Sequence, residues 1–93
     1  MRIKEVEELT GMDRANIRFY EREGLITPIR MHNGYRDYSD YDVQMLLRIK
    51  LLRSLHISLD AIKDLKDGSR KLSDTIAIQI IKLEQEKLTQ LRI

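Results

Sequence analysis

Residues 10–25 read TGMDRANIRFYEREGL, and the fold of the N-terminal half depends on them. Gly11 suits a tight turn, because glycine adopts a positive φ at no steric cost. Asp13 stands where the start of a helix favours an acid. Residues 14–23 contain no Gly or Pro, and Gly24 is a natural helix stop. The stretch therefore predicts a tight turn followed by a short helix.

A second short helix is predicted immediately before the turn. Residues 3–9, IKEVEEL, place Ile3, Val6 and Leu9 one helical turn apart, so that they form one apolar face. Two short helices joined by a tight turn are typical of a helix-turn-helix, although small helical bundles that bind no DNA show the same periodicity.

The helix predicted over about residues 13–23 leaves one face to polar side chains, namely Arg14, Asn16, Arg18 and Arg22. Arg and Asn are the side chains that pair bidentately with guanine and adenine edges in the major groove. We therefore interpret this helix as a candidate DNA recognition helix, with Arg14 and Asn16 toward the bases.

Residues 27–38, TPIRMHNGYRDY, predict a short hairpin. Pro28 ends the helical pattern, and the pair Asn33–Gly34 favours a type I′ turn in which both central residues have φ > 0. Because an isolated hairpin is barely stable in water, this one must dock on the helices, as the wing of a winged helix-turn-helix does. The wing residues that would contact DNA phosphates, or in the case of the tyrosines only pack on the core, are Arg30, Tyr35, Arg36 and Tyr38.

Two further helices are predicted after the hairpin. Ser39 has the chemistry of an N-cap for a helix over about residues 41–54. The stripe of this helix that is expected to face the core comprises Val43, Leu46, Leu47, either Ile49 or Lys50, and Leu51. Ser58 caps a second helix over about residues 59–66, which Gly68 ends.

Residues 75–93 form an unbroken helical pattern with a broad apolar side. Nothing upstream offers a surface that covers this whole side, so a partner helix is its natural cover; the alternative is that it folds back on its own domain. We expect a dimerisation helix that continues beyond residue 93. Its predicted interface comprises Ile76, Ile80, Ile81, Leu83, Leu88 and Leu91.

The composition excludes several classes of protein. Of the 93 residues, 17 are basic and 15 acidic, and this balance alone does not indicate nucleic acid. The absence of cysteine excludes a disulfide framework and a thiolate metal site. No apolar run is long enough to cross a bilayer and the N-terminus lacks the apolar core of a signal peptide, so we expect a cytoplasmic protein. His32 and His56 have no partner at metal-ligand spacing and no catalytic set can be named, so we expect neither an enzyme nor a metal or other cofactor.

Four segments together resemble one family. In chain order they are IKEVEELTGMD, IRFYEREGLITPIR, NGYRDYS and LRSLHISLDAIKDL, and a long helix follows them. The sequence resembles the N-terminal part of the MerR family of transcription regulators. This resemblance implies a mainly α-helical winged helix-turn-helix domain with a two-stranded β wing over residues 1–70. It also implies a long coiled-coil helix over residues 71–93 that pairs with its copy in a homodimer, and an effector-sensing part beyond this chain.

The resemblance also implies roles for individual residues. Arg18 and Tyr20 match the Arg and second Tyr of the family's R-Y-Y-E run, where they would hold the DNA backbone. Glu21 matches the acid of that run and is expected to be a structural partner. The wing of the family is matched by Gly34, Tyr35, Arg36 and Tyr38, and its second wing by His56.

The chain departs from the family pattern at three positions. Phe19 replaces the first Tyr of the R-Y-Y-E run, which removes one hydroxyl group. Glu7 stands where many members have Ala, at the edge of the helix pair. His56 replaces the usual Gly, and if this turn requires φ > 0, His is among the residues that tolerate it.

The resemblance implies a sequence-specific regulator that binds a pseudo-palindromic promoter as a homodimer. Such a regulator bends and untwists the promoter spacer, so that RNA polymerase engages both promoter elements; the partners are double-stranded DNA and, indirectly, the polymerase. Two alternatives stay open from the residues. One is a protein-interaction module that acts through its C-terminal helix, and the other is an excisionase-like architectural DNA binder, which needs no long dimer helix.

Overall fold

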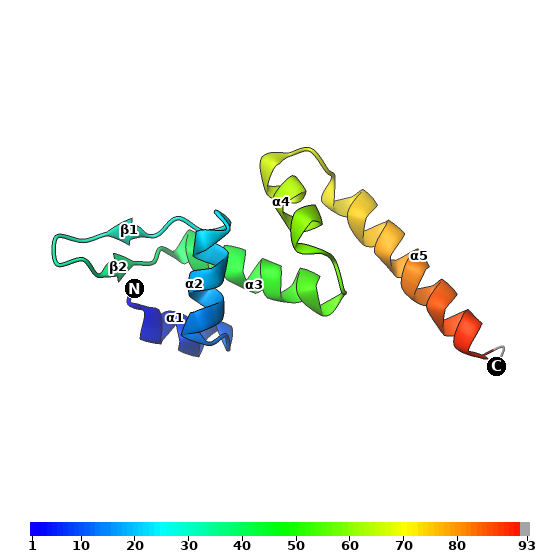
Figure 1. The fold of residues 1–93 in the computed structure, drawn as a ribbon, viewed down its shortest axis with the longest axis horizontal. Helices are drawn as coiled ribbons and strands as arrows, with labels where there is room; N and C mark the ends of the chain where they lie inside the picture. The colour runs from blue at the N-terminus through cyan, green and yellow to red at the C-terminus, as the bar shows by residue number, and fades with distance from the viewer. Residues whose placement is uncertain (92–93) are drawn as a thin grey trace. The chain divides into compact units, whose positions relative to one another are not determined.

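The computed structural model describes the backbone of residues 1–91 and the side chains of residues 1–89. The described part is mainly helical with a two-stranded antiparallel sheet, as predicted (Figure 1). It divides into two compact units, residues 1–51 and the chain from residue 52 onward. The predicted functional boundary at residue 70 stays a prediction. In chain order the elements are α1 (Ile3–Thr10), α2 (Arg14–Arg22), β1 (Ile29–Arg30), β2 (Arg36–Asp37), α3 (Asp40–Ser54), α4 (Leu59–Asp67) and α5 (Leu72–Leu91).

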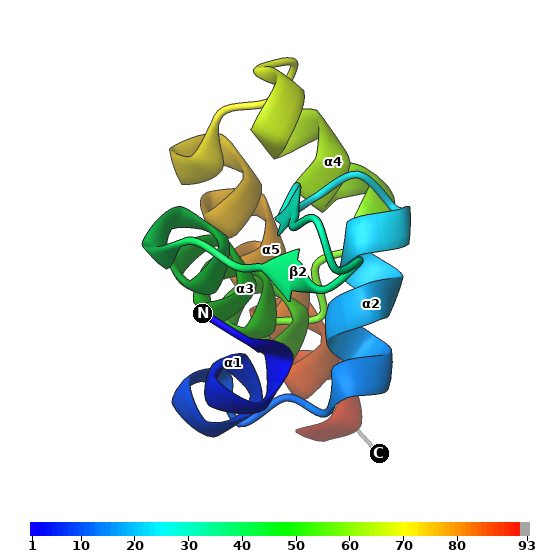
Figure 2. The same cartoon turned by 90° about the vertical axis from the view of Figure 1, so that its left-hand side faces the viewer.

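The turn between α1 and α2 forms as its sequence predicts, and Figure 2 shows the two helices meeting there. Gly11 adopts φ +70° and donates its N–H to the Glu7 carbonyl at 2.9 Å. Asp13 caps α2, because its side chain accepts a hydrogen bond from the Asn16 N–H at 2.9 Å. The helix-turn-helix is therefore confirmed.

The core of the first unit differs from the prediction on α1. Val6 is fully buried, but Leu9 is 57% exposed, so the prediction that Leu9 faces inward is wrong. A spacing of three residues falls short of a full 3.6-residue turn, and the apolar face has rotated outward by Leu9. Thr10 is buried instead, where its hydroxyl donates to the Val6 carbonyl at 2.7 Å and accepts from the Met12 N–H at 3.2 Å.

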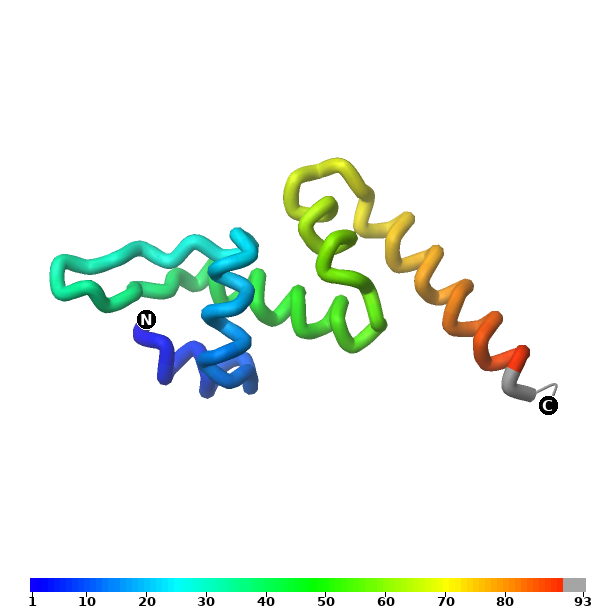
Figure 3. The backbone as a smooth tube through the Cα atoms, in the orientation of Figure 1, coloured from blue at the N-terminus to red at the C-terminus, as the bar shows by residue number. Residues whose placement is uncertain are grey.

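The hairpin forms with a different turn from the predicted one, and it extends beyond the helices of its unit (Figure 3). Arg30 pairs with Arg36 across the two strands. Gly34 adopts φ +81°, but Asn33 does not have a positive φ, so the type I′ prediction is wrong. The Asn33 side chain instead accepts the Tyr35 N–H at 3.1 Å. The result is a three-residue loop with a glycine in the left-handed region, the next most common hairpin closure.

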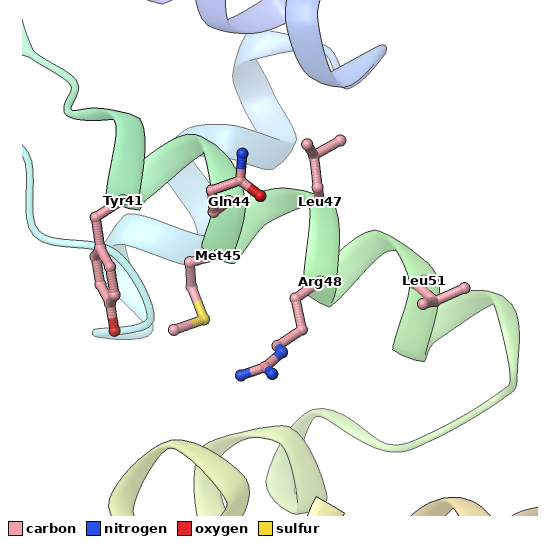
Figure 4. Close-up of a pocket in the computed structure, with 6 residues that line it drawn as sticks. All are labelled: Tyr41, Gln44, Met45, Leu47, Arg48 and Leu51. Carbon is pink, nitrogen blue, oxygen red and sulfur yellow. The ribbon is translucent and has the colours of Figure 1, made fainter.

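Helix α3 begins at a reciprocal cap and supplies much of the core. Ser39 Oγ accepts from the Asp42 N–H at 3.1 Å, and Asp42 Oδ2 accepts from the Ser39 N–H at 2.9 Å. The predicted apolar stripe is wrong at Leu47, which is 37% exposed, and at Leu51, which is 61% exposed. Leu52 is buried in their place. Figure 4 shows a pocket on α3 that is lined by Tyr41, Gln44, Met45, Leu47, Arg48 and Leu51.

The second unit follows the predicted pattern closely. Ser58 caps α4 by accepting the Ala61 N–H at 3.1 Å, and Gly68 ends the helix with φ +86°. The turn before α4 does require a positive φ, because His56, which replaces the usual glycine of the family, adopts φ +61°. It is the sole non-glycine residue with positive φ in the described range. Among the described residues, no helix is both long and apolar enough to span a membrane.

Helix α5 begins at Leu72, earlier than the predicted residue 75, and its apolar side is divided. One edge packs within the second unit, where Ile76 and Leu83 are half-buried and Gln79 Nε2 donates to the Leu55 carbonyl at 2.8 Å. Four further large apolar side chains of α5 are exposed, namely Ile78, Ile80, Ile81 and Leu88. The side chain of Leu91, also predicted in the interface, lies outside the described residues.

Substitution of Gly11 tests the contact between α3 and the helix-turn-helix. Lys50 Nζ donates to the Thr10 carbonyl at 2.8 Å, and a Cβ on Gly11 would meet that Nζ at 2.9 Å. Gly11→Ala should therefore lose about 1–2 kcal/mol of unfolding free energy for the positive φ and about 1 kcal/mol more for the displaced hydrogen bond. Urea denaturation measures both variants, with Gly34→Ala as the control, because open space surrounds that Cβ position. Equal losses in the two variants would mean that the Lys50 contact contributes nothing.

Candidate nucleic-acid interface

A cavity of about 350 Å³ in the first unit gathers positive charge from three elements. The start of α1, the exposed face of α2 and the hairpin all contribute to its walls. The lining residues are Arg2, Ile3, Lys4, Arg14, Arg18, Gly34, Tyr35, Arg36 and Tyr38. Five of these are Arg or Lys, a density that the small net charge of +2 does not reveal. Such a concentration of one sign raises the local potential and suits a polyanion.

Most of the predicted contact residues meet at this cavity, and two basic residues join them that the sequence did not single out. Arg2 and Lys4 lie at the start of α1, for which the sequence predicts only a short helix with one apolar face. The Arg2 guanidinium lies over the ring of Tyr35, 4.8 Å from its centroid. The sequence shows two basic residues, one on either side of Ile3. It does not show that they lie close to the hairpin, because that closeness depends on the tertiary structure.

Other predicted residues lie away from the cavity. Asn16 and Arg30 are exposed, on the first turn of α2 and on β1. Tyr20 is only 9% exposed and packs edge-on against Phe19, with ring centroids 5.3 Å apart. His56 belongs to the second unit, where it is exposed. Their DNA contacts stay predictions, and burial leaves Tyr20 little surface to offer.

An ion pair joins the hairpin to α2. Arg36 Nε on β2 lies 2.6 Å from Glu21 Oε1 on α2, and the two side chains are only 27% and 21% exposed. The contact with the Glu21 carboxylate raises the pKa of Arg36 above its ordinary value. This arrangement confirms Glu21 as a structural partner. It also commits Arg36 to the carboxylate, so that substituting Arg36 would disturb both the fold and any DNA contact.

Tyr38 is buried at the base of the hairpin. It is 1% exposed, and its hydroxyl has no hydrogen-bond partner among the described residues. Burial raises the pKa of the Tyr38 phenol above its ordinary value, and the nearby Glu21 charge adds to this effect. The hydroxyl is closed off from solvent, so the predicted contact to DNA is not what this structure shows. Tyr38 packs on the core, which is the alternative that the sequence left open.

Arg14 and Arg18 are the exposed bases of α2 that reach the cavity. Arg14 is 52% exposed and forms an ion pair with Glu7 on α1, in which Nη2 lies 2.9 Å from Oε1. Arg18 lies one turn further along the same helix and is exposed. The N-terminal half of α2 thus presents two guanidinium groups, which are forks suited to phosphate oxygens and guanine edges.

Replacing Tyr38 by Phe separates packing from DNA contact. The variant should be as stable as the wild type or up to about 1 kcal/mol more stable at neutral pH, because it removes a buried hydroxyl without a partner. The wild type should lose stability as the pH rises above about 10, where an unfolded tyrosine ionises while the folded Tyr38 keeps its proton. Tyr38→Phe should lose less over the same range in urea denaturation at about pH 8 and about pH 11. A variant that is less stable at neutral pH would show a hydrogen bond from this hydroxyl.

Comparison with known proteins assigns the domain that holds this site. Residues 1–69 match the family model described as MerR HTH family regulatory protein. The chain is 39% identical over 85 residues to the HTH-type transcriptional regulator HmrR of Sinorhizobium medicae, an alignment that covers 86% of this chain and 58% of HmrR. The chain thus spans less than two thirds of the length of that relative.

Solved structures show the same fold. The N-terminal part of the Bacillus subtilis multidrug transporter activator, MtaN, has a TM-score of 0.87 at 26% identity, over 99% of this chain and 89% of that one. HiNmlR, a MerR family regulator lacking the sensor domain and bound to promoter DNA, has a TM-score of 0.70 at 25% identity, over 99% of this chain and 75% of that one. The family match and the winged helix-turn-helix with its basic cavity lead to one assignment: the chain belongs to the MerR family of helix-turn-helix regulatory proteins.

Proposed function

We propose that this protein is a sequence-specific DNA-binding regulator of transcription that acts in the cytoplasm and catalyses no reaction. The observation that carries the proposal is the convergence of five basic side chains on one cavity beside α2. The basic residues come from three separate segments of the chain, so their meeting is a property of the fold. The promoter-bound state of the similar protein HiNmlR supports DNA as the polyanion.

The exposed residues of the site divide between two kinds of contact. Arg14 and Asn16 lie in the first turn of α2, and the N-terminal residues of a recognition helix reach the base edges in the major groove. Arg18, Arg2 and Lys4 would bind phosphates, which fixes the protein's position on the duplex without reading its sequence. The hairpin would add Arg30 from the exposed side of β1.

Control of transcription would follow from deformation of the DNA. As the resemblance to the family implies, two copies would bind the two halves of a pseudo-palindromic site and would bend and untwist the spacer between them. This deformation would let RNA polymerase engage both promoter elements. Smoothly bending a DNA site of about 20–30 base pairs by about 40–90° costs on the order of 1–6 kcal/mol. Several charge-assisted phosphate contacts from each copy are sufficient to offset that cost.

A homodimer would supply the second half-site, and α5 is the element proposed to pair. Its exposed apolar residues Ile78, Ile81 and Leu88 follow the spacing of a coiled-coil seam together with Gln85. Ile80 lies beside this row and is 45% exposed. Ile76 and Leu83 are half-buried within their own unit, so we place the centre of the interface on the side of Ile81.

Arg18→Ala tests the DNA contact at a residue that forms no ion pair within the part of the chain that the structure describes. We expect binding to weaken on the order of tenfold and the slope of log K against log salt to fall by about one unit, because one phosphate contact is lost. Arg48→Ala is the matched control, since Arg48 is an exposed arginine on α3 that does not line the basic cavity. Fluorescence anisotropy across a salt series measures both quantities. If the two variants weaken binding equally, the cavity is not the DNA site.

Ile81→Asp tests the proposed dimer. A charge on the exposed apolar side should shift the protein toward the monomer by at least tenfold in dissociation constant, because it would be buried in the seam without a partner. Lys82→Asp introduces the same side chain on the neighbouring polar side and should leave the dimer intact. Sedimentation equilibrium gives both constants. Dimers of equal strength would place the pairing surface elsewhere.

A further inference from the structure

One carboxylate connects the two helices of the helix-turn-helix. Glu7 on α1 accepts two hydrogen bonds from a single residue of α2. Its Oε2 accepts from the backbone N–H of Arg14 at 3.0 Å, and its Oε1 accepts from Arg14 Nη2 at 2.9 Å. The Glu7 side chain is 26% exposed, so this contact is partly shielded from water.

These two bonds fix both ends of Arg14. The backbone N–H at the start of a helix has no partner within the helix, and Glu7 provides one from outside. The same carboxylate holds the end of the side chain, which otherwise samples many rotamers in water. Asp13 accepts the Asn16 N–H, so Asp13 and Glu7 satisfy two different N–H groups in the first turn of α2.

The guanidinium keeps donors for a second partner. An arginine has five N–H donors in a planar fork, and the Glu7 contact engages Nη2 alone. The Arg14 side chain remains 52% exposed, and it is the first residue of α2. A guanine presents two acceptors, N7 and O6, that match two donors of one guanidinium.

We propose that Glu7 is a specificity-determining positioning residue, which holds the Arg14 guanidinium in one pose so that its remaining donors read a guanine in the major groove. The proposal rests on the proposed DNA-binding function. Holding the fork in advance lowers the entropy lost on binding and makes a misplaced acceptor costly. The contrary possibility is that the ion pair withholds Arg14 from DNA, and it predicts the opposite effect.

The test is selection of bound duplexes from random DNA, followed by competition with single-base variants of the selected sequence. The wild type should favour a guanine at one position by roughly 10- to 100-fold over other bases. Glu7→Ala should lower that preference by about fivefold or more at this position and leave the other positions unchanged. Glu7→Gln, which keeps one acceptor, should fall between the two. Glu8→Ala removes the same charge from an exposed neighbour on α1 and should keep the full preference.

Arg14→Lys provides a second route if Glu7→Ala unfolds, which thermal denaturation would show. Lysine lacks the planar fork, so Arg14→Lys should lower the preference for guanine at the same base position. Glu7→Gln combined with Arg14→Lys should lower that preference no further. Unchanged preference in Glu7→Gln and Glu7→Ala at every position overturns the proposal. Tighter binding of Glu7→Ala than of Glu8→Ala to all duplexes also overturns it, because Glu7 would then be withholding Arg14. A wild type that enriches no sequence contradicts the proposed function itself.

Discussion

The ion pair between Arg36 Nε and Glu21 Oε1, which lie 2.6 Å apart, joins the hairpin to α2. The two strands are each two residues long, too short to be stable in water without support. Tyr38 adds a buried ring at the base of the hairpin, and its N–H donates to the Met1 carbonyl at 2.8 Å. Because the hairpin is held on both sides, its residue Gly34 and the bases of α2 line one cavity.

The positions of the charged residues, more than the net charge, determine where the surface of the first unit is basic. Two of the acids that bring the net charge down to +2 are paired within the helix-turn-helix unit, where Glu7 contacts Arg14 and Glu21 contacts Arg36. These pairs partly neutralise Arg14 and Arg36, so the remaining positive charge of the cavity comes mainly from Arg2, Lys4 and Arg18. Arg2, by contrast, lies over the Tyr35 ring and forms no ion pair among the described residues. The composition could therefore be balanced while the binding face remained basic.

The sequence predicted best what depends on neighbouring residues. The predicted caps at Asp13 and Ser58 are confirmed, because each cap depends only on a hydrogen bond between the side chain and the backbone N–H three residues later. The predicted type I′ turn at Asn33–Gly34 is wrong because Met31 pairs with Tyr35. This pairing leaves a three-residue loop, and loop length selects the type of turn. Leu47 shows a further limit, since periodicity marks an apolar stripe without saying how wide the core beneath it is.

Contacts between distant segments were beyond the sequence. Nothing in the spacing of Arg2 and Lys4 indicates that the hairpin lies beside them. The family resemblance supplied the wing and the expectation that Glu21 is structural, but not the identity of its partner. The Glu7 contact was visible only as a departure from the family pattern, and the structure turned that departure into an observed bond.

The most direct measurement of the central claim is an NMR titration of the protein with its selected duplex, followed through the backbone amide resonances. If DNA binds at the basic cavity, the largest shift changes fall in residues 2–4, 14–18 and 30–36, where the cavity and its rim lie. Residues 41–51, on α3, should change little. Largest changes on α3, or changes spread evenly over the whole chain, would contradict the claim that this cavity is the DNA-binding site.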